Sequence, residues 1–116
     1  MKCEYNSDLE FQERLVKVTN EIKKDYPLIS TDDAVKIASI ALPINDYPTN
    51  DDKFDRLYRI MLIIGKDNPE YSHAFNDLYN LYEDGLKNPI YKELMTGIID
   101  YCAGLRDSFP YLDEYI

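Results

Sequence analysis

Residues 68–91 read NPEYSHAFNDLYNLYEDGLKNPIY, and an Asn-Pro pair occurs at each end of this stretch. Between the two Asn-Pro pairs, aromatic and apolar residues recur in steps of four, three and four, at Tyr71, Phe75, Leu78 and Tyr82. That spacing places them on one face of an α-helix. The stretch therefore predicts a helix from Pro69 to about Gly85.

Each Asn-Pro pair is followed two positions later by a tyrosine, in Asn68-Pro69-Glu70-Tyr71 and in Asn88-Pro89-Ile90-Tyr91. Asparagine before a helix accepts a hydrogen bond from a backbone N–H of the first turn, and proline at the first position gives up an N–H that would be unpaired anyway. Asn-Pro-x-Tyr is also an endocytic tag, but the tag requires a flexible tail. Because the motif here precedes a strongly periodic helix, we interpret each copy as a helix start signal.

Prolines at 27, 43, 48, 69, 89 and 110 divide the rest of the chain into blocks of similar length. Four further helices are predicted, from Ser7 to Tyr26, from Ser30 or Thr31 to Leu42, from Thr49 or Asn50 to Ile64, and from Pro89 to about Ser108. The second is alanine-rich and apolar on most sides, which predicts a centrally buried helix. The fold class expected is all-α, a compact single-domain bundle of about five helices, mostly antiparallel neighbours, over residues 1–116.

The tail formed by residues 109–116 is too apolar for a free end. We expect it to pack back on the bundle. Gly97 and Gly104 lie seven residues apart and hence on one face of the last predicted helix, although both lower its stability. That face would admit another helix or the tail at close range, or form a dimer seam.

Charge and composition exclude several classes of function. The chain has 22 acidic and 13 basic residues, a formal net charge of −9, and 45% hydrophobic residues. The negative electrostatic field that results from this net charge repels nucleic acid and anionic membranes and attracts basic partners. No stretch approaches the ~20 apolar residues of a membrane span, and the N-terminus lacks a signal-peptide pattern. We therefore expect a cytoplasmic protein with reduced thiols at Cys3 and Cys102, although spacing alone leaves a Cys3–Cys102 disulfide open.

The sequence offers little for catalysis. Its single histidine forms Glu70-x-x-His73, the spacing used in di-iron bundles, but those sites need two such motifs and two more inward glutamates. We interpret this as a solvated helix face. No Cys-x-x-Cys, phosphate-binding loop or calcium loop occurs, so we expect no enzyme activity, no cofactor and no metal.

The longest predicted loop carries the candidate binding site. It joins aspartates to one tyrosine, a combination that suits capture of a basic protein, because charge steers the encounter and the ring fixes the complex. A neighbouring helix would widen the patch if it lies beside the loop. The alternative is an ordinary turn followed by acidic residues that cap a helix. The predicted partner-binding residues are Asp46, Tyr47, Asp51, Asp52, Asp55, Tyr79, Glu83 and Asp84.

In charge, size, expected helix content and the Asp46-Tyr47-Pro48 turn, the chain resembles the small acidic helical immunity proteins of nuclease bacteriocins. The resemblance covers no alignable length, and no residue is transferred from it. It implies an inhibitor that blocks a basic partner, as immunity proteins do with toxins and phage-encoded antagonists do with nucleic-acid enzymes. The alternative is a non-enzymatic homo-oligomeric module, for example a homodimer through the Gly97/Gly104 face.

Overall fold

The computed structural model describes the backbone of residues 2–116 and the side chains from Leu9 onward. Within that range the chain forms five α-helices and two short 3-10 helices, with no strand. This confirms the predicted all-α bundle of about five helices. The elements are α1 (Lys2–Asp25), α2 (Thr31–Ile40), η1 (Ile44–Asp46), α3 (Asn50–Ile64), α4 (Glu70–Asp84), α5 (Pro89–Cys102) and η2 (Leu112–Tyr115).

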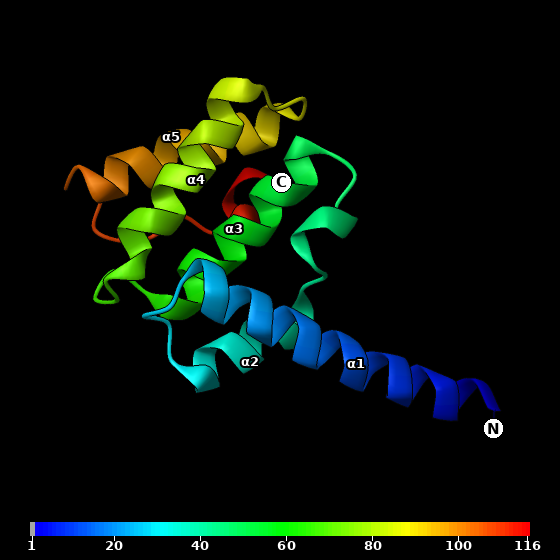
Figure 1. The fold of residues 1–116 in the computed structure, drawn as a ribbon. Coiled ribbons are helices and arrows are strands. Elements are labelled where there is room, and N and C mark those ends of the chain that lie inside the picture. Colours follow the sequence, from blue (N-terminus) through cyan, green and yellow to red (C-terminus); the bar gives the residue numbers. More distant parts are fainter. Residues whose placement is uncertain (1) are drawn as a thin grey trace.

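Successive helices run in opposite directions (Figure 1). α1 packs against α2, α3 packs against α4, and α5 contacts α4 and, through the Tyr91 and Phe54 rings, α3. α2 also contacts α3, which joins the two halves of the bundle. The expected antiparallel arrangement of neighbouring helices is therefore confirmed.

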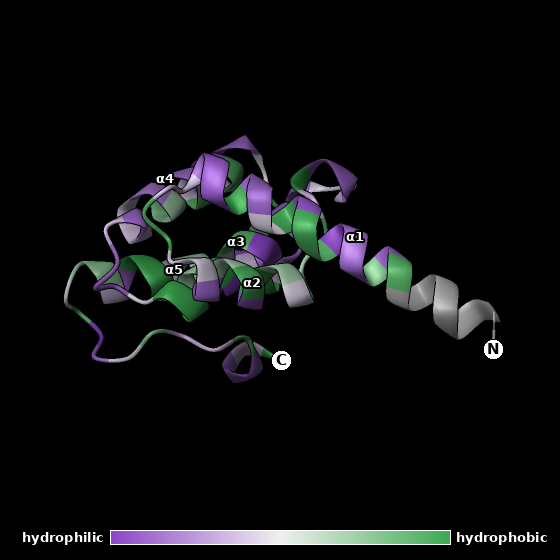
Figure 2. Ribbon diagram, turned by 60° about the horizontal axis from the view of Figure 1, so that its bottom comes forward, coloured by the Kyte–Doolittle hydropathy of each residue, from purple (hydrophilic) through white to green (hydrophobic). Residues whose placement is uncertain are grey.

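The central helix is α3, and the prediction that the second helix occupies this place is wrong. α2 buries Ala34, Ile37 and Ala38 but exposes Val35 and Ile40. α3 buries side chains on more than one side, because α1 and α2 cover it from one direction and α4 from the other. Its buried residues are Phe54, Arg56, Leu57, Tyr58, Ile60 and Met61. The outward side of α4, by contrast, is mostly hydrophilic (Figure 2).

The Asn-Pro pairs open helices as predicted. The Asn88 side-chain oxygen accepts from Ile90 N at 3.0 Å, and that of Asn68 accepts from Glu70 N at 2.8 Å. Tyr71 is buried in the core, and Tyr91 is half-buried against it. The repeat thus marks two helix starts.

Two helix boundaries differ from the prediction by five or more residues, and α2 also ends earlier than predicted, at Ile40 rather than Leu42. α1 already begins at Lys2, so Ser7 lies within the helix, while the side chains of Ser7 and Cys3 lie outside the described residues. α5 stops at Cys102 because Gly104 takes the left-handed conformation, with φ of 80°, and the following N–H of Leu105 turns back to Asp100 O at 2.8 Å. Gly104 is therefore past the helix and does not share a face with Gly97.

The C-terminal segment after α5 returns across Tyr58 of α3. The Tyr58 hydroxyl donates to Pro110 O at 2.8 Å and accepts from Leu112 N at 3.0 Å. Pro110 and Tyr115 lie over Gly97, where an added Cβ would come within 3.2 Å of the proline ring and 2.5 Å of the tyrosine hydroxyl. Because its own chain covers Gly97, this face is not a dimer seam.

Replacing Gly97 with valine should displace the C-terminal segment. The added methyl groups have no room against the Pro110 ring, and overpacking of this kind costs about 1–3 kcal/mol. Urea denaturation should show the loss, and chymotrypsin should cleave faster after Tyr111. The matched control is Thr96→Val at the exposed neighbouring position; equal stability and cleavage of the two variants would contradict the proposed contact.

Candidate functional site: a cleft between α1, α3 and α4

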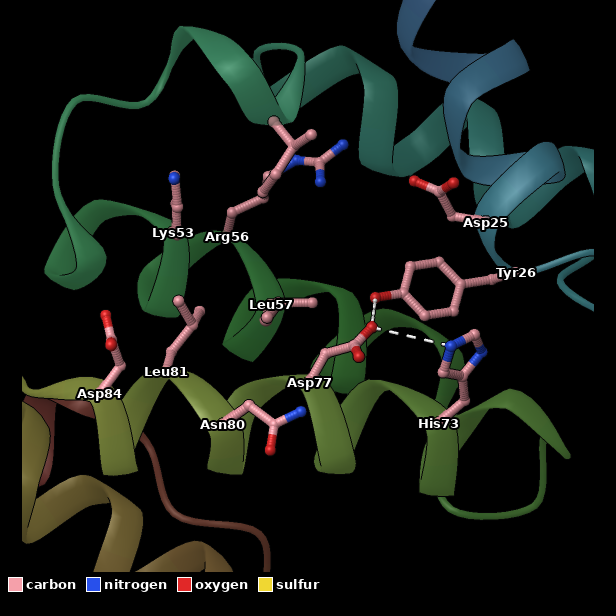
Figure 3. A pocket seen from close by; sticks show the side chains of 11 residues that line it. Asp25, Tyr26, Lys53, Arg56, Leu57, His73, Asp77, Asn80, Leu81 and Asp84 are labelled. Atoms are coloured by element: carbon pink, nitrogen blue, oxygen red, sulfur yellow. Dashed lines mark hydrogen bonds and ion pairs between the residues drawn. The ribbon is translucent and has the colours of Figure 1, made fainter.

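A cleft of about 630 Å³ lies where the end of α1, η1, α3 and α4 meet (Figure 3). Its size is in the range of pockets that bind small ligands or peptide segments. Leu57 and Leu81 supply apolar surface. The polar side chains that line it come from three helices and are Asp25, Tyr26, Lys53, Arg56, His73, Asp77, Asn80 and Asp84.

The α4 side of the cleft follows from helical spacing. His73, Asp77 and Asp84 are separated by steps of four and seven, which align on one face of a helix. Figure 3 shows these side chains along α4, with Tyr26 entering from the end of α1. The Tyr26 hydroxyl donates to Asp77 Oδ2 at 2.6 Å, so the end of α1 is tied to the middle of α4.

A chain of polar contacts continues from Asp77 towards the start of α4. His73 Nε2 lies 3.8 Å from Asp77 Oδ2, and His73 Nδ1 lies 3.1 Å from Glu70 Oε1. Glu70 is buried and also accepts from Leu28 N at 2.8 Å. The prediction of a solvated Glu70–His73 face is therefore wrong at Glu70, which connects α4 to the turn after α1.

Burial raises the pKa of Tyr26 far above its ordinary value, and the hydrogen bond to Asp77 raises it further. The phenol consequently stays protonated and remains a donor to Asp77 Oδ2. Since the described contacts of Asp77 all use Oδ2, its Oδ1 is left to accept from a ligand in the cleft. This fixes one carboxylate at the α4 wall.

The α3 wall carries two bases one turn apart, Lys53 and Arg56. Arg56 is only 3% exposed, and its Nη2 pairs with Glu21 Oε1 of α1. Glu21 also accepts from Ile44 N, at 3.2 Å for each oxygen. This buried pair fastens α1 and η1 to α3 and sets the shape of the upper part of the cleft.

Several acids of the predicted patch have structural partners. The Asp51 carboxylate accepts from Lys87 N at 2.8 Å and from Asn88 N at 2.9 Å, which fixes the turn between α4 and α5. Asp84 Oδ2 accepts from the Asn50 amide at 2.6 Å. The end of α4 thus lies beside the start of α3, and Asp84 also lines the cleft.

Other predicted residues surround a different tyrosine. Asp52 Oδ2 accepts from the Thr49 hydroxyl at 2.9 Å, and Asp55 Oδ2 forms an ion pair with Arg59 Nε at 3.0 Å. Burial raises the pKa of Tyr91, and three nearby carboxylates raise it further, those of Asp55, Asp52 and Asp51. The aromatic ring beside this acidic group is therefore Tyr91.

The remaining predicted residues lie apart from that group or face solvent. Tyr47 is half-buried, and its hydroxyl accepts from Leu42 N at 3.0 Å, which braces its own loop. Asp46 and Glu83 are exposed. Tyr79 is also exposed and lies in an aromatic row on α4. Its ring centroid is 6.3 Å from that of Phe75 and 6.0 Å from that of Tyr82.

Sequence reasoning missed most of the cleft, since Asp84 alone is shared with the predicted patch. The periodic polar face of α4 was visible, but its partners Tyr26 and Arg56 come from distant helices. Comparisons with known proteins found no match among protein-family models, curated proteins or solved structures.

Metal-binding clusters and membrane-spanning helices are absent from the described part of the chain. No group of three or more histidine, cysteine, aspartate or glutamate side chains is arranged to hold a metal ion there. No helix in that range combines the length and apolar character required to span a membrane.

Replacing Asp51 with alanine should destabilise the fold by about 1–3 kcal/mol, because two backbone donors lose a charged acceptor. Chemical denaturation followed by circular dichroism measures the change. Asp46→Ala is the control, since Asp46 is exposed and takes no part in a described side-chain hydrogen bond. A stability change no larger than that of the control would show that the Asp51 contacts contribute nothing.

The raised pKa of Tyr26 predicts a loss of stability at alkaline pH. Above the ordinary tyrosine pKa of 10.0, the unfolded chain loses a proton that folded Tyr26 keeps, so the free energy of unfolding falls as pH rises. One such group contributes a slope of about 1.4 kcal/mol per pH unit. Urea titrations at pH 9, 10 and 11 should therefore show a shallower decline for Tyr26→Phe than for the wild type or Tyr79→Phe. Parallel declines in all three proteins would contradict this role of Tyr26.

Proposed function

We propose that this protein binds a basic segment of another protein in the cleft between α1, α3 and α4 and thereby inhibits that partner. The carrying observation is the fixed carboxylate of Asp77, which Tyr26 orients at 2.6 Å while Oδ1 remains available. A carboxylate already held in place binds a cation without the entropy loss of ordering a free side chain. A lysine or arginine side chain is the complementary group.

Local charge supports a cationic ligand. Three aspartates line the cleft, namely Asp25, Asp77 and Asp84. Of the two bases, Arg56 is offset by Glu21, which leaves Lys53. The cleft is thus net acidic, as is the whole chain with its formal charge of −9. Long-range attraction of a basic partner would speed the encounter and would weaken as salt is added.

The predicted acidic patch has a secondary part in this proposal. Its exposed members Asp46, Glu83 and Tyr79 add negative surface and an aromatic ring for steering and peripheral contact. Asp51, Asp52 and Asp55 contribute charge but are engaged in internal contacts. The proposed role is binding without catalysis, and the predicted cytoplasmic location is retained as part of the proposal.

A displayed library of 12-residue peptides tests the proposal directly. Selected peptides should be rich in lysine and arginine, and their affinity should fall at least tenfold from 50 to 300 mM NaCl because exposed charges are screened. Asp25→Lys should weaken binding at least tenfold, since the aspartate is exposed beside the cleft and lysine at the end of a helix is tolerated.

The matched control is Glu10→Lys, the same charge change on the exposed surface of α1 away from the cleft. It should leave affinity within about twofold. Selection of acidic or purely apolar peptides, no selection at all, or equal effects of the two substitutions would each refute the proposal.

A homo-oligomeric module is the second candidate. The observation in its favour is a set of exposed apolar side chains on α1, on α2 and just after it, which are Leu9, Val16, Ile40 and Leu42. Two of them, Val16 and Ile40, are 60% and 55% exposed. Self-association that persists at 1 M NaCl in sedimentation would favour this candidate, because burial of apolar surface is not screened by salt.

A further inference from the structure

A buried donor without a partner belongs to Arg56, a residue that lines the α3 wall of the cleft. Arg56 is 3% exposed, and while Nη2 pairs with Glu21, no acceptor lies within hydrogen-bonding distance of Nε among the described residues. An unpaired buried donor destabilises the fold, so buried polar groups normally have a partner. An acceptor group on a ligand would supply the missing hydrogen-bond partner of Arg56 Nε.

Lys53 provides a second donor on the same wall. It precedes Arg56 by one helical turn, is half-buried, and takes part in none of the ion pairs found in the described region. What distinguishes Lys53 from the other lysines without an ion pair is its place in the cleft lining beside the buried Arg56. Together the two side chains match a carboxylate, which a guanidinium recognises well.

The acidic side chains of the cleft come from α4 and the end of α1, and its lysine and arginine come from α3. Asp77 extends from α4 and Asp25 from the end of α1, whereas Lys53 and Arg56 extend from α3 (Figure 3). Leu57 and Leu81 lie between them and offer surface to an aliphatic chain. The cleft therefore has an anion-binding side, an apolar middle and a cation-binding side.

We infer that the ligand is a C-terminal lysine or arginine of the partner protein. Its α-carboxylate binds Arg56 and Lys53, its methylenes pack on Leu57 and Leu81, and its terminal cation binds Asp77 and Asp25. This inference rests on the proposed function and specifies which basic segment the cleft takes. A cleft of about 630 Å³ has room for several residues, which favours a chain terminus over a free amino acid.

Two synthetic peptides test the inference, acetyl-GSALGAK with a free C-terminal carboxylate and the same peptide with a C-terminal amide. Calorimetry should show at least tenfold tighter binding of the acid, because the amide cannot pair with the two bases. Lys53→Met should reduce the ratio of the two affinities to less than about threefold. Lys92→Met, an exposed lysine of α5, is the control and should preserve the ratio.

Equal affinity for acid and amide would overturn the inference and leave the proposed function standing, since a basic peptide would still bind. The same holds if only peptides with internal basic residues bind. Free lysine binding as tightly as the acid peptide would overturn the assignment to a chain terminus. If no basic peptide of any kind binds, the proposed function fails as well.

Discussion

The buried guanidinium of Arg56 is the constraint on which the arrangement of the other elements depends. A charge removed from water must be paired, and Glu21 of α1 supplies the carboxylate. The same carboxylate accepts from Ile44 N, so α1, η1 and α3 meet at one point. With α1 held there, its last residues lead Tyr26 to α4, and the cleft is the space that remains between these elements.

Acidic residues serve two different purposes in this fold. Asp51 and Asp84 hold the start of α3 against the end of α4 and the following turn, through backbone and side-chain donors. Among the described side chains Asp25 has no hydrogen-bond or ion-pair partner, and Asp77 uses one oxygen for Tyr26. A net charge of −9 thus does not describe a uniform acidic surface; the carboxylates that remain available are those at the cleft and at exposed positions such as Asp46.

Local sequence was sufficient for the helix pattern. The two Asn-Pro pairs, the Thr49 cap and Gly65 act within one or two turns, so they predicted the bounds of α3 and α4 closely. The end of α5 was missed because the backbone conformation of Gly104 decides it.

The cleft could not be predicted because no local pattern connects its parts. Tyr26 and Asp77 are 51 positions apart, and Arg56 and Glu21 are 35 apart. Only the packing of α1 across α3 and α4 brings them together. The patch proposed around Tyr47 followed from charge density along the chain, whereas the structure places the nearby acids around Tyr91 and at the helix ends.

The most direct test of the account is a map of backbone amide chemical shifts during titration of labelled protein with a lysine-terminated peptide. The largest changes should fall at Tyr26, Lys53 and Asp77 and their neighbours, that is, just after α1, on α3 and on α4. Changes centred on Asp46 and Tyr47, or on the exposed apolar residues of α1 and α2, would contradict it.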